Sequence, residues 1–302
     1  MKAITFEEFG GPEVLRLTQV DEPHAGPGQV RLQVRAAGIN PMDHKIRNGW
    51  LAEAFPTTFP AIPGNEASGV VDEVGEGVTG VAVGDEVFGL IAGGAYAEHA
   101  IAFVFARKPS GLGWAEAAAL PVAALTAARD LDLLGVTADD TLLIHGAAGG
   151  VGTVAVQMGV ARGATVIGTA SAANHEYLRS LGAVPLAYGD GLVSRVRETA
   201  PQGVDAVYDI AGQGALPDSI ELRGGTTDRI VTIADPTGAA LGIPLSTAMA
   251  TDGDRILAEA AQMAVDGKLR IVIAADLPLA DAAKAMAQNE TGHAQGKIVL
   301  HP

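Results

Sequence analysis

The sequence predicts an α/β protein in which a doubly wound parallel sheet is inserted into a mainly antiparallel, barrel-like domain. Three observations lead to this prediction. Up to about residue 110, short strand-like runs alternate with Gly, Pro and Asp turns, as in antiparallel barrels. Beyond Ala115, Ala- and Leu-rich helical runs alternate with apolar strands, which indicates parallel strands joined by crossover helices. The last two strands break this alternation, so we expect them to return to the first domain.

The barrel-like domain is assigned to residues 1–113 and 267–302, and the parallel-sheet domain to residues 114–266. The strands expected in the first domain are Lys2–Phe6, Leu15–Val20, Gln29–Ala37, Ala67–Val74, Glu86–Leu90, Ala95–Ile101, Leu269–Ala274 and Lys297–Leu300, with a helix at Leu279–Asn289. The Pro-rich stretch Gly38–Asn65 is predicted to be one long loop. Loops of that length are usually functional or disordered.

The second domain is expected to alternate strands with helices. Its predicted strands are Thr141–His145, Thr165–Thr169, Val184–Ala187, Ala206–Asp209 and Ile230–Ala234. Its predicted helices are Ala115–Leu120, Val122–Leu134, Thr153–Ala161, Ala173–Leu181, Gly191–Thr199 and Asp254–Asp266. This order fits right-handed crossovers over a parallel sheet.

Composition narrows the possible partners. The net charge of −15 argues against nucleic acid and against an anionic membrane, because both bind basic surfaces. The absence of cysteine excludes disulfides and thiolate metal ligands. No apolar run has the length of a signal-peptide core or a membrane helix, so we expect a cytoplasmic protein.

The segment Leu142–Gly152 has the sequence LLIHGAAGGVG, an apolar strand that leads through small residues into a helix. Glycines let the backbone approach a phosphate closely, and the helix dipole favours negative charge at that end. The segment therefore favours the pyrophosphate site of a dinucleotide-binding fold, with Ala147 in place of the first glycine of G-x-G-x-x-G. The alternative is a tight strand-to-helix turn that binds nothing.

The end of the next strand indicates which dinucleotide is bound. An acidic residue usually follows this strand and binds the adenosine ribose of NAD. Here Ala170 and Ser171 follow it, with Asn174 and His175 just beyond. A carboxylate would repel a 2′-phosphate, whereas these polar groups can bind it, so NADPH is favoured. Two alternatives stay open: Ser171 caps the following helix, and His175 is an exposed helical residue.

A metal site is not expected. The candidate zinc ligands are His24, His44, Glu66 and His99, and their spacings form no recognisable set.

Several segments, in order, resemble the zinc-independent medium-chain dehydrogenases/reductases, and most closely their quinone oxidoreductase-like branch. They are Ala36–Asp43 (AAGINPMD), Ile62–Val71 (IPGNEASGVV), Gly84–Val87 (GDEV), the glycine segment, Thr169–Ser171, Leu181–Ala183 and Gly296–Leu300. The resemblance implies a Rossmann domain inserted in a GroES-like catalytic domain, and a homodimer. Zinc-dependent relatives have a Cys near Asn40 and a His at position 65, so the resemblance also implies that no zinc is bound.

The resemblance further implies which residues contact the cofactor. Pyrophosphate would lie at Ala148, Gly149, Gly150 and Val151, and the 2′-phosphate at Ser171. The other expected contacts are Asn40, Thr126, His175, Tyr188, Ile233 and Lys297. From the residues alone, Tyr188 could equally be a strand-end aromatic, and Lys297 could equally be a solvated strand residue.

The expected reaction is hydride transfer from NADPH to a quinone or an α,β-unsaturated carbonyl. Asn40 would donate to a carbonyl or orient the nicotinamide amide, Asp43 would fix the loop, and Trp50 would form an apolar wall. No side chain is an evident proton donor, so water is expected to supply the proton. An enoyl-thioester or other C=C reductase is one alternative, and a non-catalytic NADP-binding family member is another.

Overall fold

The computed structural model describes residues 1–292 and 296–302, which form two compact units. One unit comprises Met1–Val122, Asp252–Asp266 and Ile271–Pro302, and the other comprises Ala123–Thr251 and Gly267–Arg270. These units begin and end at different residues from the domains expected above. Helices α2 (Trp114–Ala119) and α8 (Gly253–Val265) belong to the first unit, because α2 packs on strands β3 and β4 and α8 packs on β6.

The first unit is built on a six-stranded sheet with the order β12-β13-β3-β4-β5-β6. Its strands are β3 (Val30–Gly38), β4 (Glu66–Val74), β5 (Glu86–Ala92), β6 (His99–Arg107), β12 (Ile273–Pro278) and β13 (Lys297–His301). Strand β3 also pairs with β6, which closes the four strands β3 to β6 into a barrel. Strand β13 pairs antiparallel with β3, so the last strands return to this unit as predicted.

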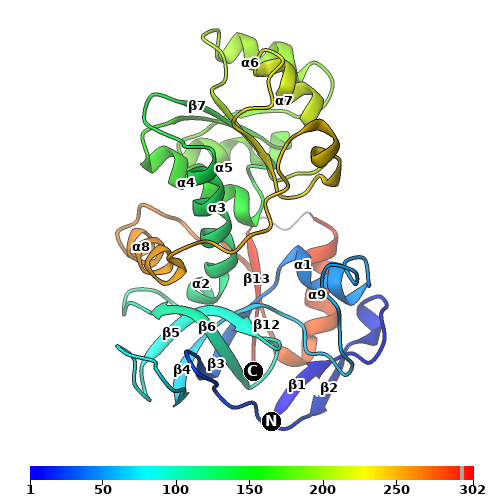
Figure 1. The fold of residues 1–302 in the computed structure, drawn as a ribbon, viewed down its shortest axis with the longest axis vertical. Helices are drawn as coiled ribbons and strands as arrows, with labels where there is room; N and C mark the ends of the chain where they lie inside the picture. The colour runs from blue at the N-terminus through cyan, green and yellow to red at the C-terminus, as the bar shows by residue number, and fades with distance from the viewer. Residues whose placement is uncertain (293–295) are drawn as a thin grey trace. The chain divides into compact units, whose positions relative to one another are not determined.

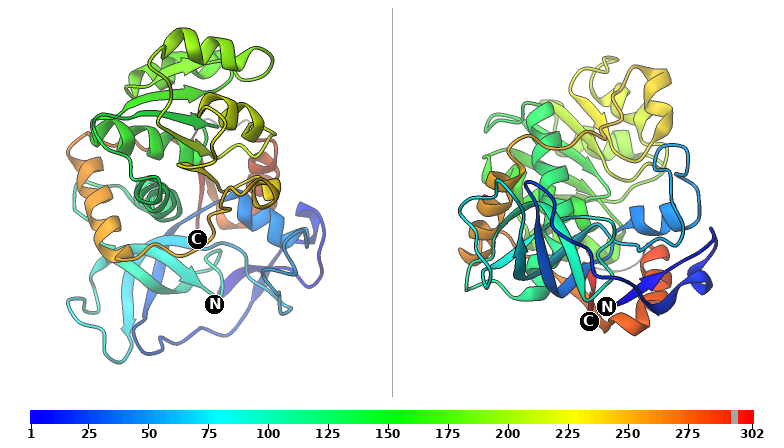
Figure 2. Two further views of the ribbon diagram at one scale, coloured as in Figure 1. Left: turned by 45° about the horizontal axis from the view of Figure 1, so that its top comes forward. Right: turned by 60° about the horizontal axis from the view of Figure 1, so that its bottom comes forward.

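The remaining elements of the first unit surround this barrel. They are β1 (Lys2–Thr5), β2 (Arg16–Gln19), α1 (Pro41–Arg47), α9 (Ala282–Glu290) and the 3₁₀ turns η1 (Pro12–Val14) and η4 (Leu279–Asp281). Both chain ends lie at the same end of the unit (Figures 1 and 2). Alternate residues of β3, including Val30, Leu32 and Val34, point into the apolar core, as the two-residue period of a strand requires.

Three expectations about this unit were wrong in detail. The stretch Gly38–Asn65 contains helix α1, because Asp43 accepts a hydrogen bond from the Asn40 N–H at 2.8 Å and so satisfies a free donor at the helix start. Strand β6 begins at His99 because the N–H groups of Ala95 and Tyr96 bond to the Pro63 carbonyl.

Strand β12 begins at Ile273 and not at Leu269, because the segment before it is bonded to the other unit. The side-chain amide of Gln157 accepts from the Arg270 N–H at 2.6 Å and donates to the Arg270 carbonyl at 3.1 Å.

The second unit contains a five-stranded parallel sheet with the order β11-β10-β7-β8-β9. Its strands are β7 (Thr141–His145), β8 (Thr165–Thr169), β9 (Val184–Leu186), β10 (Ala206–Asp209) and β11 (Ile230–Thr232). Its helices are α4 (Gly150–Ala161), α5 (His175–Ser180), α6 (Leu192–Thr199) and α7 (Leu216–Leu222), with 3₁₀ turns η2 (Ala172–Asn174) and η3 (Pro236–Leu241). Helix α3 (Pro121–Leu133) leads into it. Helix α7 was not predicted.

Apolar side chains from one face of the parallel sheet pack against α6 and α7. Leu143 and Val207 on the sheet meet Leu192, Val196 and Leu216 from the two helices. None of the helices in residues 1–292 and 296–302 is both long and apolar enough to cross a lipid bilayer.

Candidate active site

The glycine segment forms a tight turn between β7 and α4. Gly146 has a positive φ of 75°, a conformation that glycine adopts without strain. A Cβ at Gly152 would lie 2.2 Å from the Gly146 carbonyl oxygen, so only glycine fits there. The first turn of a helix leaves its N–H groups without intrahelical acceptors, and here these belong to Gly150, Val151 and Gly152. The turn therefore presents several backbone donors to an anion.

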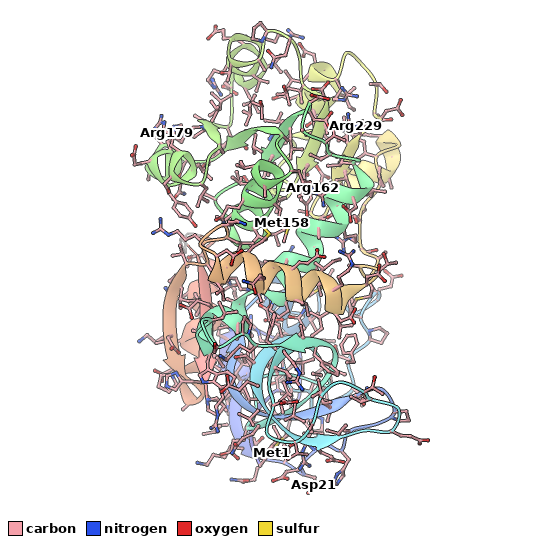
Figure 3. All side chains as sticks on the ribbon, turned by 90° about the vertical axis from the view of Figure 1, so that its left-hand side faces the viewer. Met1, Asp21, Met158, Arg162, Arg179 and Arg229 are labelled. Carbon is pink, nitrogen blue, oxygen red and sulfur yellow. The ribbon has the colours of Figure 1, made fainter. Side chains whose placement is uncertain are left out.

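The end of β8 presents small polar side chains. Ser171 is half-buried, and its hydroxyl lies 3.2 Å from Asn174 Nδ2. Within the described part of the chain this hydroxyl makes no capping bond to the turn that follows. His175 is half-buried, with Nε2 3.3 Å from the Ala170 carbonyl oxygen. Arg179, on α5 at the edge of the unit, pairs with Glu176 at 3.5 Å (Figure 3).

Two buried polar groups fix the ends of the neighbouring strands. His145 lies with Nδ1 3.3 Å from Thr169 Oγ1 and Nε2 3.1 Å from Ser219 Oγ, and burial lowers the pKa of this imidazole. The Asp209 carboxylate accepts from the Thr232 hydroxyl at 2.7 Å, and the Asp209 backbone carbonyl accepts from the Ile233 N–H at 3.0 Å. These bonds order the backbone at the carboxyl ends of the strands, where dinucleotides bind in this type of sheet.

Three other residues of this unit were expected to contact the cofactor, and they lie on three different segments. Thr126 is half-buried on α3, and Ile233 is half-buried directly after β11. Tyr188 follows β9 and is 61% exposed, so it does not pack as a buried strand-end aromatic.

In the first unit, four polar side chains form a polar cluster: Asn40, Glu66 and Lys297, which are buried, and Asn65, which is half-buried. The Lys297 ammonium, on β13, donates to Glu66 Oε1 at 2.6 Å and to Asn40 Oδ1 at 2.5 Å. Asn40 Nδ2 donates to Glu66 Oε1 at 2.8 Å and to Asn65 Oδ1 at 3.0 Å. Lys297 is therefore a buried, paired cation and not a solvated strand residue.

Asp43 lies beside this cluster, at the start of α1. Its Oδ2 accepts from the Asn40 N–H and from the Tyr96 hydroxyl, both at 2.8 Å. Burial is the largest influence on this carboxyl group and raises its pKa to about 6, although its two hydrogen bonds and the charge of Lys297 act in the opposite direction. Burial also raises the pKa of Tyr96 well above its usual value.

A cavity of about 430 Å³ adjoins the cluster in the same unit. Apolar side chains of Phe6, Ile46, Phe55, Ile62 and Ile91 form much of its wall, and the polar side chains in the wall are Asp43, Thr57, Thr58 and Asn65. Its lining includes neither Lys nor Arg among the described residues. The cavity suits a neutral, largely apolar molecule that needs few hydrogen bonds.

Trp50 is not part of the cavity wall. It lies after α1, is 69% exposed and meets the His44 ring edge-on at 6.0 Å. Its expected role as an apolar wall stays a prediction.

Two family models match the chain: "Alcohol dehydrogenase GroES-like domain" over residues 26–130 and "Zinc-binding dehydrogenase" over residues 181–300. The chain is 32% identical to 2-methylene-furan-3-one reductase of Solanum lycopersicum, over 100% of this chain and 79% of that protein. It belongs to the medium-chain dehydrogenase/reductase family, in the quinone oxidoreductase-like branch.

Solved structures of that branch match the whole chain. Quinone oxidoreductase from Coxiella burnetii is 32% identical, with a TM-score of 0.86 over 100% of this chain and 99% of that one. Escherichia coli quinone oxidoreductase complexed with NADPH is 27% identical, with a TM-score of 0.85 over 100% of both chains. The predicted fold class and family are thereby confirmed.

One of the matching family models is described as zinc-binding, which makes it relevant whether this chain has side chains that could bind zinc. Among the described residues of this medium-chain dehydrogenase/reductase, no group of three or more His, Cys, Asp or Glu could hold a metal ion. The resemblance linked position 65 and a position near Asn40 to zinc ligands, and in this chain Asn40 and Asn65 are hydrogen-bonded to each other at 3.0 Å. Independence of zinc stays a prediction.

Two residues of this site were not predicted in their observed roles. Glu66 was considered only as a metal-ligand candidate, and Tyr96 was not singled out. A carboxylate next to the apolar run Ala67–Val71 signals a buried charge that needs a partner, and this signal could have identified Glu66. No local signal identifies Tyr96, because its contact with Asp43 joins residues 53 positions apart.

Proposed function

We propose that this protein is an NADPH-dependent reductase that transfers hydride to quinones or α,β-unsaturated carbonyls. The observation that carries this proposal is the apolar cavity whose wall contains Asp43 and Asn65, beside the buried Asn40–Lys297 pair. The cavity provides room for a flat carbonyl compound, and the cluster provides fixed N–H donors next to it. The name of the Solanum lycopersicum relative, a methylene-furanone reductase, supports an enone as acceptor.

The residues of the second unit fit NADPH. Gly152 leaves the space that a Cβ would fill, and the first turn of α4 presents free backbone donors that include Gly150 and Val151. The proposed pyrophosphate contacts are Ala148, Gly149, Gly150 and Val151. Ser171 and His175 would bind the 2′-phosphate, because no carboxylate is present at the end of β8 to repel it. The remaining proposed contacts are Asn40, Thr126, Tyr188, Ile233 and Lys297. When bound, NADPH supplies the hydride, and the protein supplies binding, orientation and electrostatics.

The side chains of the first unit have separate tasks. Lys297 would donate a hydrogen bond to the nicotinamide amide or to the acceptor carbonyl, because its ammonium has one N–H beyond those bonded to Glu66 and Asn40. Both amide hydrogens of Asn40 are bonded, to Glu66 and Asn65, so Asn40 would donate to a ligand only in exchange for its bond to Asn65. Asp43 holds the start of α1 and the Tyr96 hydroxyl. With a pKa of about 6, roughly one Asp43 carboxyl in ten is protonated at neutral pH. We therefore assign the proton of the reduced product to water.

The lining of the cavity favours a neutral acceptor over an enoyl thioester. A coenzyme A or phosphopantetheine tail carries phosphate, and phosphate is bound by Arg, Lys or free N–H groups. The described lining residues include no basic side chain. An enoyl-thioester reductase remains the alternative that the assay must compare directly.

The test is loss of NADPH absorbance with a panel of acceptors: a benzoquinone, a naphthoquinone, a methylene-furanone, an open-chain enone and an enoyl-coenzyme A. Faster turnover of the neutral acceptors supports the proposal, and faster turnover of the enoyl-coenzyme A contradicts it. A saturable NADPH fluorescence titration without turnover of any acceptor would support a non-catalytic NADP-binding protein.

A homodimer, which the family resemblance implies, and a cytoplasmic location, which the sequence predicts, complete the proposal. Sedimentation equilibrium at several protein concentrations measures the oligomeric state, and a monomer at all of them contradicts the dimer.

A further inference from the structure

Glu66 begins strand β4 and is fully buried among donors from distant parts of the chain. Its Oε1 accepts from the Lys297 ammonium at 2.6 Å and from Asn40 Nδ2 at 2.8 Å. Its Oε2 accepts from the backbone N–H of Val122 at 2.8 Å. We propose that Glu66 is a positioning residue for the reduction, which fixes Lys297 and Asn40 relative to each other; this proposal rests on the function proposed above.

Only a carboxylate satisfies all three donors. An ionised carboxylate has two acceptor oxygens and no donor, whereas an amide has one oxygen and one NH₂ group. In Glu66→Gln, an amide oxygen facing Lys297 and Asn40 would leave the NH₂ group facing the Val122 N–H. The opposite orientation would place the NH₂ group against the ammonium. Either way two donors face each other, so the near-isosteric variant disturbs the cluster without opening a cavity.

Glu66 also supplies the counter-charge of Lys297. A buried cation without a counter-charge is costly, and this pairing keeps the ammonium in its place. Among the described residues, the charged groups facing Lys297 are Glu66, in direct contact, and Asp43, whose Oδ2 is already bonded to Asn40 and Tyr96. Glu66 is thus the direct partner of the ammonium, and its proposed effect on the reaction passes through that ammonium.

The experiment compares wild type, Glu66→Gln, Lys297→Met and the double variant in two assays. In the activity assay, Glu66→Gln should lower kcat/KM about 10- to 100-fold, the range for loss of a hydrogen bond to a charged group. In a fluorescence titration, Glu66→Gln should weaken NADPH binding in wild type and leave it unchanged in the Lys297→Met background.

A matched control is Glu86→Gln. Glu86 also begins a strand, β5, and pairs with a lysine, Lys108, at 2.9 Å, but it is largely exposed. This variant should match wild type in both assays. If Glu66→Gln does not fold, as judged by circular dichroism, Glu66→Asp replaces it. That variant keeps the charge but has a shorter side chain, and it should lose NADPH affinity in wild type and leave it unchanged in the Lys297→Met background.

The outcomes separate the two proposals. Wild type that neither binds NADPH nor reduces any acceptor overturns the proposed function. Active wild type with a Glu66→Gln variant of unchanged kcat/KM and NADPH affinity overturns the role of Glu66 alone. Equal losses of NADPH affinity from Glu66→Gln with and without Lys297 also overturn it, because Glu66 would then not act through that ammonium.

Discussion

Asp43 provides a quantitative test of the buried site. Burial raises the pKa of its carboxyl group from the ordinary 3.8 to about 6 in the folded protein. The folded state therefore holds this proton more tightly than the unfolded state does. As pH rises from below 3.8 to above 6, the unfolded state loses its proton first and gains stability relative to the folded state. The stabilisation contributed by protonated Asp43 is thus complete at low pH and is lost as pH rises through about 6.

The size of this effect follows from the shift. A difference of about 2 pKa units corresponds to about 3 kcal/mol in the free energy of unfolding. Asp43→Asn does not titrate, and its amide oxygen can still accept from the Asn40 N–H and the Tyr96 hydroxyl. The variant should therefore gain about 3 kcal/mol relative to wild type between about pH 4 and pH 7.

Urea unfolding, followed by circular dichroism at several pH values in that range, measures the difference between the two proteins. Groups that titrate equally in both cancel in this difference. Asp132→Asn, on the exposed side of α3, serves as the matched control. A difference between wild type and Asp43→Asn that stays constant with pH would refute the reasoning that burial dominates the pKa of Asp43.

Three further predictions follow from single contacts. Gly152→Ala places a Cβ 2.2 Å from the Gly146 carbonyl oxygen and should lower the free energy of unfolding in urea by about 1–3 kcal/mol. In the control Gly149→Ala the Cβ lies 3.4 Å from the same atom and should cost clearly less, so equal costs would contradict the close approach. Ser171→Asp should weaken NADPH binding by at least about tenfold and leave NADH binding unchanged or tighter, as measured by fluorescence titration. Unchanged NADPH affinity would show that Ser171 is not part of the 2′-phosphate site. Arg47 is fully buried and pairs with Glu290 at 2.6 Å, so Arg47→Met should lower the free energy of unfolding by about 1–3 kcal/mol. Adding Glu290→Gln to that variant should restore part of the loss, and no loss in Arg47→Met would show that this ion pair contributes nothing.

Local chemistry explains which parts of the fold could be predicted from the sequence. The glycine turn was located correctly, because a tight strand-to-helix connection requires glycine at particular positions. Helix α1 was missed, because Pro41 and the later prolines of the segment hide a short helix whose start is stabilised by Asp43. The start of β12 was misplaced because Gln157, more than a hundred residues earlier, binds the backbone of Arg270.

The site was predictable only in part for the same reason. Family resemblance indicated Asn40 and Lys297, but the partner that joins them, Glu66, is 231 residues from Lys297. Asp43 was expected to fix the loop, but its raised pKa depends on burial that no local pattern reveals. The sequence therefore indicated polar side chains of the site, whereas the hydrogen bonds that join them became visible only in the folded chain.

The three donors that meet at Glu66 have a consequence for the order of synthesis. A ribosome completes Asn40, Glu66 and Val122 well before Lys297, which follows only after the whole parallel-sheet unit has been made. Until β13 pairs with β3, the Glu66 carboxylate lacks its counter-ion and is costly to bury. A nascent or prematurely terminated chain should therefore keep this corner of the barrel hydrated and open to proteases, and addition of a single C-terminal strand completes both the sheet and the charge pair.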